Sequence, residues 1–209
     1  MALSEFRSQG ILWSVQPETS VEIHFFYTDR SPNYREYFNF CSPEEVSKAK
    51  LHRFDHLKRA QITTYYVCRL LLSEVLQTEP QDIVIQKSAF GKPYLSDSNI
   101  TFNLSHAANV SMVGITRDKA IGVDIQEIPQ QFDFGLVARD LLTTDEFASW
   151  ENLPLNLQSR DFIQKWVKKE AEAKMRGLKV SDWHGDLGSA AVLVDSKISQ
   201  YCSACCIQK

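Results

Sequence analysis

The feature that most constrains the fold of this 209-residue chain is the order of its strand-like and helix-like segments, which repeats once. Alternating or continuous apolar stretches indicate strands, and apolar residues three and four apart indicate helices. In the first round we expect a strand, two helices and three strands at residues 21–28, 43–54, 61–75, 82–87, 100–103 and 110–116. In the second round we expect a strand, two helices and two strands at residues 122–128, 144–153, 159–177, 190–194 and 199–206. This order predicts an α+β fold of two similar halves, residues 1–119 and 120–209.

The helix expected at residues 159–177 carries charged residues on its apolar line. Phe162, Trp166, Glu170 and Lys174 follow one another at intervals of four, so they share one side of the helix. A carboxylate on the Trp166 line would be partly desolvated and costly unless it had a partner, which a metal or a cationic ligand could supply. The alternative is that the stripe ends at Trp166 and that Glu170 and Lys174 form a solvated pair.

A second acidic element precedes this helix. In the strand expected at 122–128, Asp124 and Gln126 share one face because side chains alternate along a strand. Residues 117–120 form a plausible turn, so we expect this strand to pair as a hairpin with the one at 110–116. An oxygen-bearing strand face opposite a helical Glu is a suitable partial shell for Mg²⁺, which takes one or two carboxylates and completes its shell with water and phosphate.

Two further stretches combine turn formers with groups that bind phosphate. Gly91 and Pro93 flank Lys92 and would hold it on a rigid turn. Ser105 and His106 stand near the end of a strand, where each could bind phosphate oxygens through charge-assisted bonds of roughly 1.5–3 kcal/mol. Taken singly, Lys92 could equally be an ordinary turn lysine, and His106 a capping or core histidine.

Taken together, these residues resemble the Sfp-type 4′-phosphopantetheinyl transferases. The resemblance spans Phe90 to Lys174, about two fifths of the chain. It is carried by Gly91-Lys92-Pro93, Asn103-Leu104-Ser105-His106, Gly122-Val123-Asp124-Ile125 and Trp166-Val167-Lys168-Lys169-Glu170-Ala171 with Lys174. It implies a monomer of two halves related by a pseudo-twofold axis with the active site in the cleft between them. It also implies an enzyme that moves the phosphopantetheine arm of coenzyme A onto a serine of an apo acyl or peptidyl carrier protein and releases 3′,5′-ADP.

The resemblance also implies metal-binding and catalytic roles for particular residues. Asp124 and Glu170 would hold Mg²⁺, for which Mn²⁺ is a possible substitute. Many members of the family carry an acidic residue where this chain has Gln126, so we expect an amide at that metal position and a weaker metal affinity. Glu170 would also accept the proton of the carrier serine. Lys169 would hold a neighbouring group or close on the carrier protein.

The remaining residues implied by the resemblance bind coenzyme A. Lys174 and His106 would bind its phosphates, while Lys92, Pro93 and Ser105 would line its site. For the 3′-phosphate we expect Arg59, with Lys58 as the alternative. Tyr65 stands where a further basic residue would be sought. Lys58 and Arg59 could instead be the solvated face of a helix.

Composition agrees with this interpretation. A formal net charge of −3 argues against a nucleic-acid partner. No apolar run approaches membrane-spanning length, so we expect a cytoplasmic protein without a membrane partner. The five cysteines include Cys202, Cys205 and Cys206, which we expect to be free thiols of a buried strand because no second cysteine pair stands at zinc-site spacing.

Two other functions can be extracted from the same residues. A metal-dependent nuclease could use Asp124, Glu172 and Lys174, but that motif needs a strand, and on a helix Glu172 and Lys174 diverge by about 200°. A non-catalytic module that binds coenzyme A or a carrier protein is suggested only by Gln126. Such a module would bind coenzyme A without turnover, which separates it from the transferase.

Overall fold

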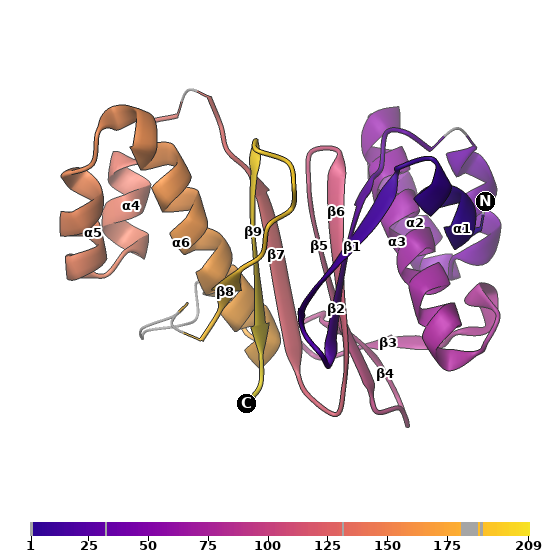
Figure 1. The fold of residues 1–209 in the computed structure, drawn as a ribbon. Coiled ribbons are helices and arrows are strands. Elements are labelled where there is room, and N and C mark those ends of the chain that lie inside the picture. The colour runs from indigo at the N-terminus through magenta and orange to yellow at the C-terminus, as the bar shows by residue number, and fades with distance from the viewer. Residues whose placement is uncertain (1, 32, 131, 181–187, 189) are drawn as a thin grey trace.

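Two antiparallel sheets lie face to face, and each carries helices on its outer side, so the molecule has four layers (Figure 1). The structure is a computed structural model that describes residues 2–31, 33–130, 132–180, 188 and 190–209. Within this described part, no helix is both long enough and apolar enough to cross a membrane.

The N-terminal sheet has the strand order β1-β2-β6-β5, and a small hairpin of β3 and β4 accompanies it. These strands are β1 (Leu12–Glu18), β2 (Val21–Tyr27), β3 (Ile85–Lys87), β4 (Pro93–Leu95), β5 (Ile100–Ala107) and β6 (Val110–Arg117). The helices of this half are α1 (Leu3–Ser8), α2 (Pro43–Leu51) and α3 (Asp55–Leu76), with 3₁₀ turns at Tyr34–Phe40 and Pro80–Asp82. Ser42 and Glu45 form a capping box at the start of α2, because each side chain bonds the backbone N–H of the other.

The C-terminal sheet has the strand order β7-β9-β8, formed by β7 (Ile121–Glu127), β8 (Val192–Leu193) and β9 (Tyr201–Ile207). Its helices are α4 (Gly135–Leu141), α5 (Thr144–Glu151) and α6 (Leu155–Arg176). The two halves share a strand order. In each, the first strand of the predicted round pairs with the last strand, and the last strand also pairs with the one before it in the chain, giving β2-β6-β5 and β7-β9-β8. The prediction of an α+β fold with two similar halves is thereby confirmed.

Among the residues that the structure describes, three apolar cores fill the spaces between the layers. Neighbouring residues of β2 show the principle: Phe26 faces the N-terminal helices, and Phe25 faces the other sheet. The core between the sheets joins Phe25 and Met112 to Val123. The third core packs α6 on the C-terminal sheet and includes Phe162. Because the middle core draws on both sheets, the two halves form one packed unit.

One strand pairing differs from the sequence prediction. The expected hairpin of residues 110–116 with 122–128 is wrong, because β6 pairs with β2 and β5, whereas β7 pairs with β9. Both edges of β6 are occupied, so the chain crosses to the second sheet after Arg117, where Asp118 adopts a positive φ of 59°. β5 also continues to Ala107, which places Ser105 and His106 inside the strand and not beyond it. Sequence patterning missed α1, β1, β4 and α4.

α6 approaches β7 most closely at Gly122. A Cβ added there would lie 2.0 Å from the carbonyl oxygen of Ala171 and 2.3 Å from the amide nitrogen of Met175. Only a residue without a side chain allows this contact between helix backbone and strand. The contact brings the last turns of α6 beside Asp124, two residues further along β7.

Candidate active site

Side chains of β5 bond the backbone of β7 across the boundary between the two sheets. The amide oxygen of Asn103 accepts a hydrogen bond from the backbone N–H of Val123 at 2.9 Å. The hydroxyl oxygen of Ser105 accepts one from the N–H of Ile125 at 3.4 Å. These contacts place Ser105 beside Asp124, so the serine of one half and the aspartate of the other form one site.

Asp124 is the centre of a polar cluster. Its side chain is 1% exposed, and a buried carboxylate requires partners. The oxygen Oδ1 accepts a hydrogen bond from the Ser105 hydroxyl at 2.7 Å and pairs with Nζ of Lys174 at 2.6 Å. The oxygen Oδ2 accepts a bond from Nε2 of Gln126 at 3.3 Å, so Asp124 and Gln126 share a face as predicted. Lys174 also donates to Ser105 at 3.1 Å.

Glu170 lies one turn before Lys174 on α6 and is half-buried. Burial raises the pKa of its carboxyl group, and the negative charge of Asp124 raises it further, while Lys174 opposes both effects. The expectation that Glu170 would be partly desolvated is therefore confirmed. A carboxylate in this setting holds a proton more strongly than a solvated glutamate does.

His106 completes the group of polar residues at this end of β5. Its side chain remains accessible, yet the protein around the imidazole lowers its pKa, and the positive charges of Lys174 and His52 lower it further. His52 follows the last residue of α2 and was not singled out from the sequence, because no pattern marks it. The negative charge of Asp124 acts on this pKa in the opposite direction, so His106 lies within electrostatic range of both Lys174 and Asp124.

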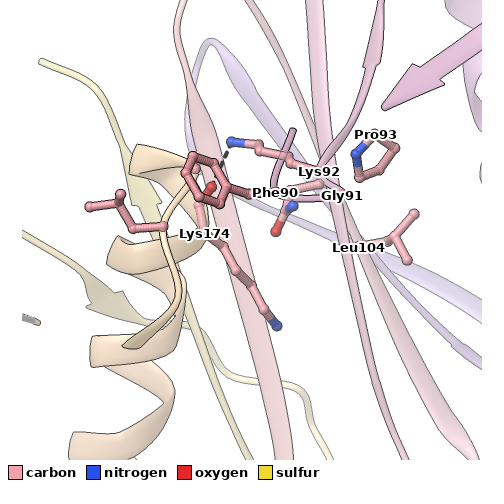
Figure 2. Close-up of a pocket in the computed structure, with 9 residues that line it drawn as sticks. Phe90, Gly91, Lys92, Pro93, Leu104 and Lys174 are labelled. Carbon is pink, nitrogen blue, oxygen red and sulfur yellow. Dashed lines mark hydrogen bonds between the residues drawn. The ribbon is translucent and has the colours of Figure 1, made fainter. Parts of the chain in front are cut away.

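Lys92 stands on the predicted turn, but its ammonium group is already used. Figure 2 shows the side chain reaching the end of α6. Its Nζ donates to the carbonyl oxygens of Lys174 at 2.6 Å, Ile121 at 3.0 Å and Met175 at 3.1 Å. Burial lowers the pKa of this amine. In this structure the ammonium group of Lys92 therefore contacts backbone carbonyls, and the membership of Lys92 in the coenzyme A site stays a prediction.

A cavity of about 270 Å³ opens beside Lys92 at the junction of the two halves (Figure 2). Three predicted site residues, Lys92, Pro93 and Lys174, line it. The other residues of its wall are Phe90, Gly91, Asn103, Leu104, Gly177 and Leu178. Four apolar or aromatic residues line the cavity, and Lys174 brings a cation to it, which suits a molecule that carries both a flat apolar group and a phosphate.

Two predicted residues lie apart from this group. Lys169 is 4% exposed, and its Nζ pairs with Glu146 of α5 at 2.9 Å, so it ties α6 to α5. Arg59 lies in the first turns of α3, and in the described part of the chain no hydrogen bond or ion pair joins it to Asp124 or Lys174. Neighbouring helix positions diverge by about 100°, which is why Glu170 and Lys169 face different elements.

The oxygen donors of the site suit a hard divalent cation. Asp124 and Glu170 supply two carboxylates, and Gln126 supplies an amide that can ligate through its oxygen. Within the described residues, no three His, Cys, Asp or Glu side chains gather closely enough to form a complete metal site by themselves. Two carboxylates are nevertheless the number that Mg²⁺ uses when substrate phosphates complete its shell.

The nuclease alternative is wrong for this chain. Residues 155–176 are helical, so Glu172 and Lys174 point in different directions. Glu172 is buried and bonds Arg176 at 2.7 Å and the backbone N–H of Gly188 at 2.7 Å, whereas Lys174 bonds Asp124. The three residues of that motif therefore do not share a site.

Comparison with known proteins gives the class of this fold and site. The family model of the 4′-phosphopantetheinyl transferase superfamily matches residues 120–209, and the model of the 4′-phosphopantetheinyl transferase N-terminal region matches residues 28–116. The chain belongs to the 4′-phosphopantetheinyl transferase family.

Three curated relatives carry the name 4′-phosphopantetheinyl transferase. HetI of Nostoc sp. is 26% identical over 140 residues, which are 65% of this chain and 59% of HetI. Psf-1 of Bacillus pumilus is 28% identical over 143 residues, which are 68% of this chain and 60% of psf-1. Gsp of Aneurinibacillus migulanus is 29% identical over 148 residues, which are 68% of this chain and 60% of gsp. The chain thus spans about three fifths of the length of these relatives.

Proposed function

We propose that this protein transfers the 4′-phosphopantetheine arm of coenzyme A to a serine hydroxyl of an apo acyl or peptidyl carrier protein and releases 3′,5′-ADP. The observation that carries the proposal is the cluster of Asp124, Ser105 and Lys174 beside Glu170 and His106, where the two halves meet. The family membership and the names of the relatives support it.

Coenzyme A would lie in the cavity at the junction with its pyrophosphate toward Lys174. Lys174 would supply positive charge to the phosphate oxygens, and His106 would donate a hydrogen bond from its imidazole. The backbone of Lys92 and the ring of Pro93 would form part of the wall. The adenosine 3′-phosphate would extend toward α3, where Arg59 and Lys58 are the nearest candidates along the chain. Phosphoryl transfer depends mainly on such positioning and charge neutralisation.

Glu170 is proposed to accept the proton of the carrier serine. The serine oxygen forms a bond to the β-phosphorus of coenzyme A while the bond from that phosphorus to the bridging oxygen breaks. The bridging oxygen and its electron pair leave with 3′,5′-ADP, and the serine proton moves to the carboxylate of Glu170. The raised pKa of Glu170 makes its carboxylate a better proton acceptor than a solvated glutamate, and a positioned base contributes about 10²–10⁴ in rate.

Asp124, Glu170 and Gln126 are the residues proposed to hold Mg²⁺, and Mn²⁺ would suit the same oxygens. When bound, the ion would neutralise charge on the pyrophosphate oxygens. Gln126 brings no negative charge, so metal affinity would depend more on the phosphates of coenzyme A. Because one chain supplies both halves of the cluster, we propose that the protein acts as a monomer.

The test is to incubate the purified protein with coenzyme A, Mg²⁺ and an apo carrier protein and to weigh the carrier by mass spectrometry. A gain of one phosphopantetheine arm that EDTA abolishes is the expected result. Glu170→Gln and Asp124→Ala should each lose most of the turnover. Glu151→Gln, on an exposed part of α5, is the matched control and should keep it.

Two results would contradict the proposal. Near-normal turnover in either site variant would show that the cluster is not the active site. Binding of coenzyme A without transfer to any carrier would indicate the non-catalytic module, for which the relatives' names give no support.

A further inference from the structure

The ammonium group of Lys92 joins three separate segments of the chain at one point. Lys92 belongs to the turn between β3 and β4, where Gly91 has a φ of 81° and the carbonyl of Lys92 accepts a bond from Ser88 N–H at 2.9 Å. An ammonium has three N–H donors, and here the three acceptors are the carbonyls of Ile121, Lys174 and Met175. Lys92 thereby connects a turn of the N-terminal half to the start of β7 and the end of α6.

The end of a helix is a favourable place for such a cation. The last carbonyl groups of a helix lack the full set of helical partners, and the negative end of the helix dipole lies there. In α6 the Lys174 carbonyl accepts one bond from the capping N–H of Gly177 at 3.2 Å and a second from Lys92. Lys174 and Met175 directly precede Arg176, the last residue of α6, and Ile121 is the first residue of β7. Burial of an ammonium is costly, and the three carbonyl oxygens offset that cost. To reach a phosphate instead, Lys92 would have to leave these carbonyls.

Lys174 takes part in this arrangement with two different groups. Its carbonyl oxygen accepts the shortest of the three bonds from Lys92, and its side-chain Nζ reaches Asp124 at 2.6 Å. Figure 2 shows the amine of Lys92 directed to the backbone of Lys174, whose own side chain extends away from Lys92. Fixing the backbone of Lys174 therefore limits where its ammonium group can reach and favours the contact with Asp124.

We propose that Lys92 is a positioning residue that holds Lys174 over Asp124 by clamping the end of α6 to β7, and that its own ammonium group does not bind coenzyme A phosphate. The kinetic consequences rest on the proposed function, because they assume that Lys174 meets the phosphates. The structural consequence, that Lys92 fixes Lys174, does not.

The first experiment needs no turnover. The wild-type protein is treated briefly with an amine-reactive reagent, with and without coenzyme A, and the labelling of each lysine is measured by mass spectrometry. Lys92 should be among the least reactive lysines in both samples. In the Lys92→Met variant, Lys174 should become several-fold more reactive while other lysines stay unchanged. Lys87→Met is the matched control, because Lys87 lies on the same hairpin as Lys92 but pairs with Glu44 of α2. It should leave the reactivity of Lys174 unchanged.

Two outcomes of this labelling would overturn the proposal. The first is a Lys92 that reacts readily in the free protein and becomes protected by coenzyme A, as a phosphate ligand would. The second is an unchanged Lys174 in a folded Lys92→Met protein. The wild-type comparison decides the first point even if the variant does not fold.

A double-mutant cycle then tests the catalytic consequence. Lys92→Met should lower kcat/KM about as much as Lys174→Met, and the double variant should be no worse than Lys174→Met alone, because both changes remove one interaction. Lys92→Arg keeps donors at this position and should recover part of the loss. If Lys92 bound phosphate directly, Lys92→Met would raise the KM for coenzyme A by the same factor in both backgrounds. A protein that transfers nothing would refute the proposed function, and the labelling result would still decide the role of Lys92.

Discussion

Replacing Gly122 by alanine tests the contact on which the geometry of the site depends. The added Cβ would lie 2.0 Å from the carbonyl oxygen of Ala171, 2.3 Å from the amide nitrogen of Met175 and 2.9 Å from its Cα. All three atoms belong to the backbone of α6, so no side-chain rotation relieves the overlap. To reach an ordinary separation of about 3.4 Å from Ala171, helix and strand would have to move apart by about 1.4 Å (3.4 minus 2.0).

The size of the effect follows from that displacement. Overpacking of a core commonly costs 1–3 kcal/mol when side chains can adjust, and backbone opposition puts this site at the upper end, at about 3 kcal/mol or more. A shift of about 1.4 Å would also stretch the contact of Lys174 with Asp124, now 2.6 Å, toward about 4 Å. We therefore expect Gly122→Ala to lose both stability and transferase activity.

Equilibrium unfolding in urea, followed by circular dichroism, measures the loss of stability. Gly10→Ala is the control: its φ of 65° makes alanine strained by about 1–2 kcal/mol, but nothing lies within 4 Å of the added Cβ. Gly122→Ala should therefore be the more destabilising of the two, and the only one to displace Lys174. A Gly122→Ala protein within 1 kcal/mol of wild type and with normal kcat would refute the argument.

Three further predictions concern other parts of the molecule. Lys169→Met should lower the free energy of unfolding in urea by about 2 kcal/mol and leave kcat of the folded protein nearly unchanged. The loss is smaller than for a fully buried pair because Glu146 keeps some exposure. Lost kcat at normal stability would instead make Lys169 catalytic. Burial lowers the pKa of His24, although the carboxylate of Glu22 opposes this shift. As the pH falls below about 6.5, the unfolded state binds a proton at His24 and the folded state does not, so stability falls. Unfolding of His24→Gln at pH 7.5 and 5.5 should show a weaker pH dependence than the wild type. Gln126→Glu should lower the Mg²⁺ concentration for half-maximal transfer, and calorimetry with Mn²⁺ should show the same gain.

Local patterning predicted the elements that carry the site. The spacing of Phe162, Trp166, Glu170 and Lys174 identified α6, and alternation along β7 put Asp124 and Gln126 on one face. Both patterns depend only on the helical and strand repeats, which are properties of neighbouring residues. The desolvation of Glu170 followed from the same reasoning, because a carboxylate on an apolar line must lie against the core.

The failures concern contacts between distant segments. The hairpin prediction assumed that strands adjacent in sequence pair, but β2 and β5 occupy both edges of β6. The sequence also placed Lys92 on a turn without showing that the turn meets α6, whose contacted residue Lys174 lies 82 positions later. The neighbouring group that Lys169 holds could not be named for a related reason, because its direction on the helix has meaning only once α5 and Glu146 are placed. Such choices depend on packing, which no local repeat encodes.

The junction between the halves uses side chains where a continuous sheet would use backbone. The side chains of Asn103 and Ser105 accept hydrogen bonds from the backbone N–H groups of Val123 and Ile125. The ammonium group of Lys92 donates to the carbonyl of Ile121. A ladder of backbone bonds would bring β5 and β7 to about 4.8 Å, with no side chain between them. Side-chain bonds hold the strands together at a wider spacing and point the Ser105 hydroxyl at Asp124. The same bonds thus satisfy buried backbone groups and build the polar cluster. Substitutions at this junction should therefore lower stability and activity together, whereas substitutions in α4 and α5 should lower stability alone.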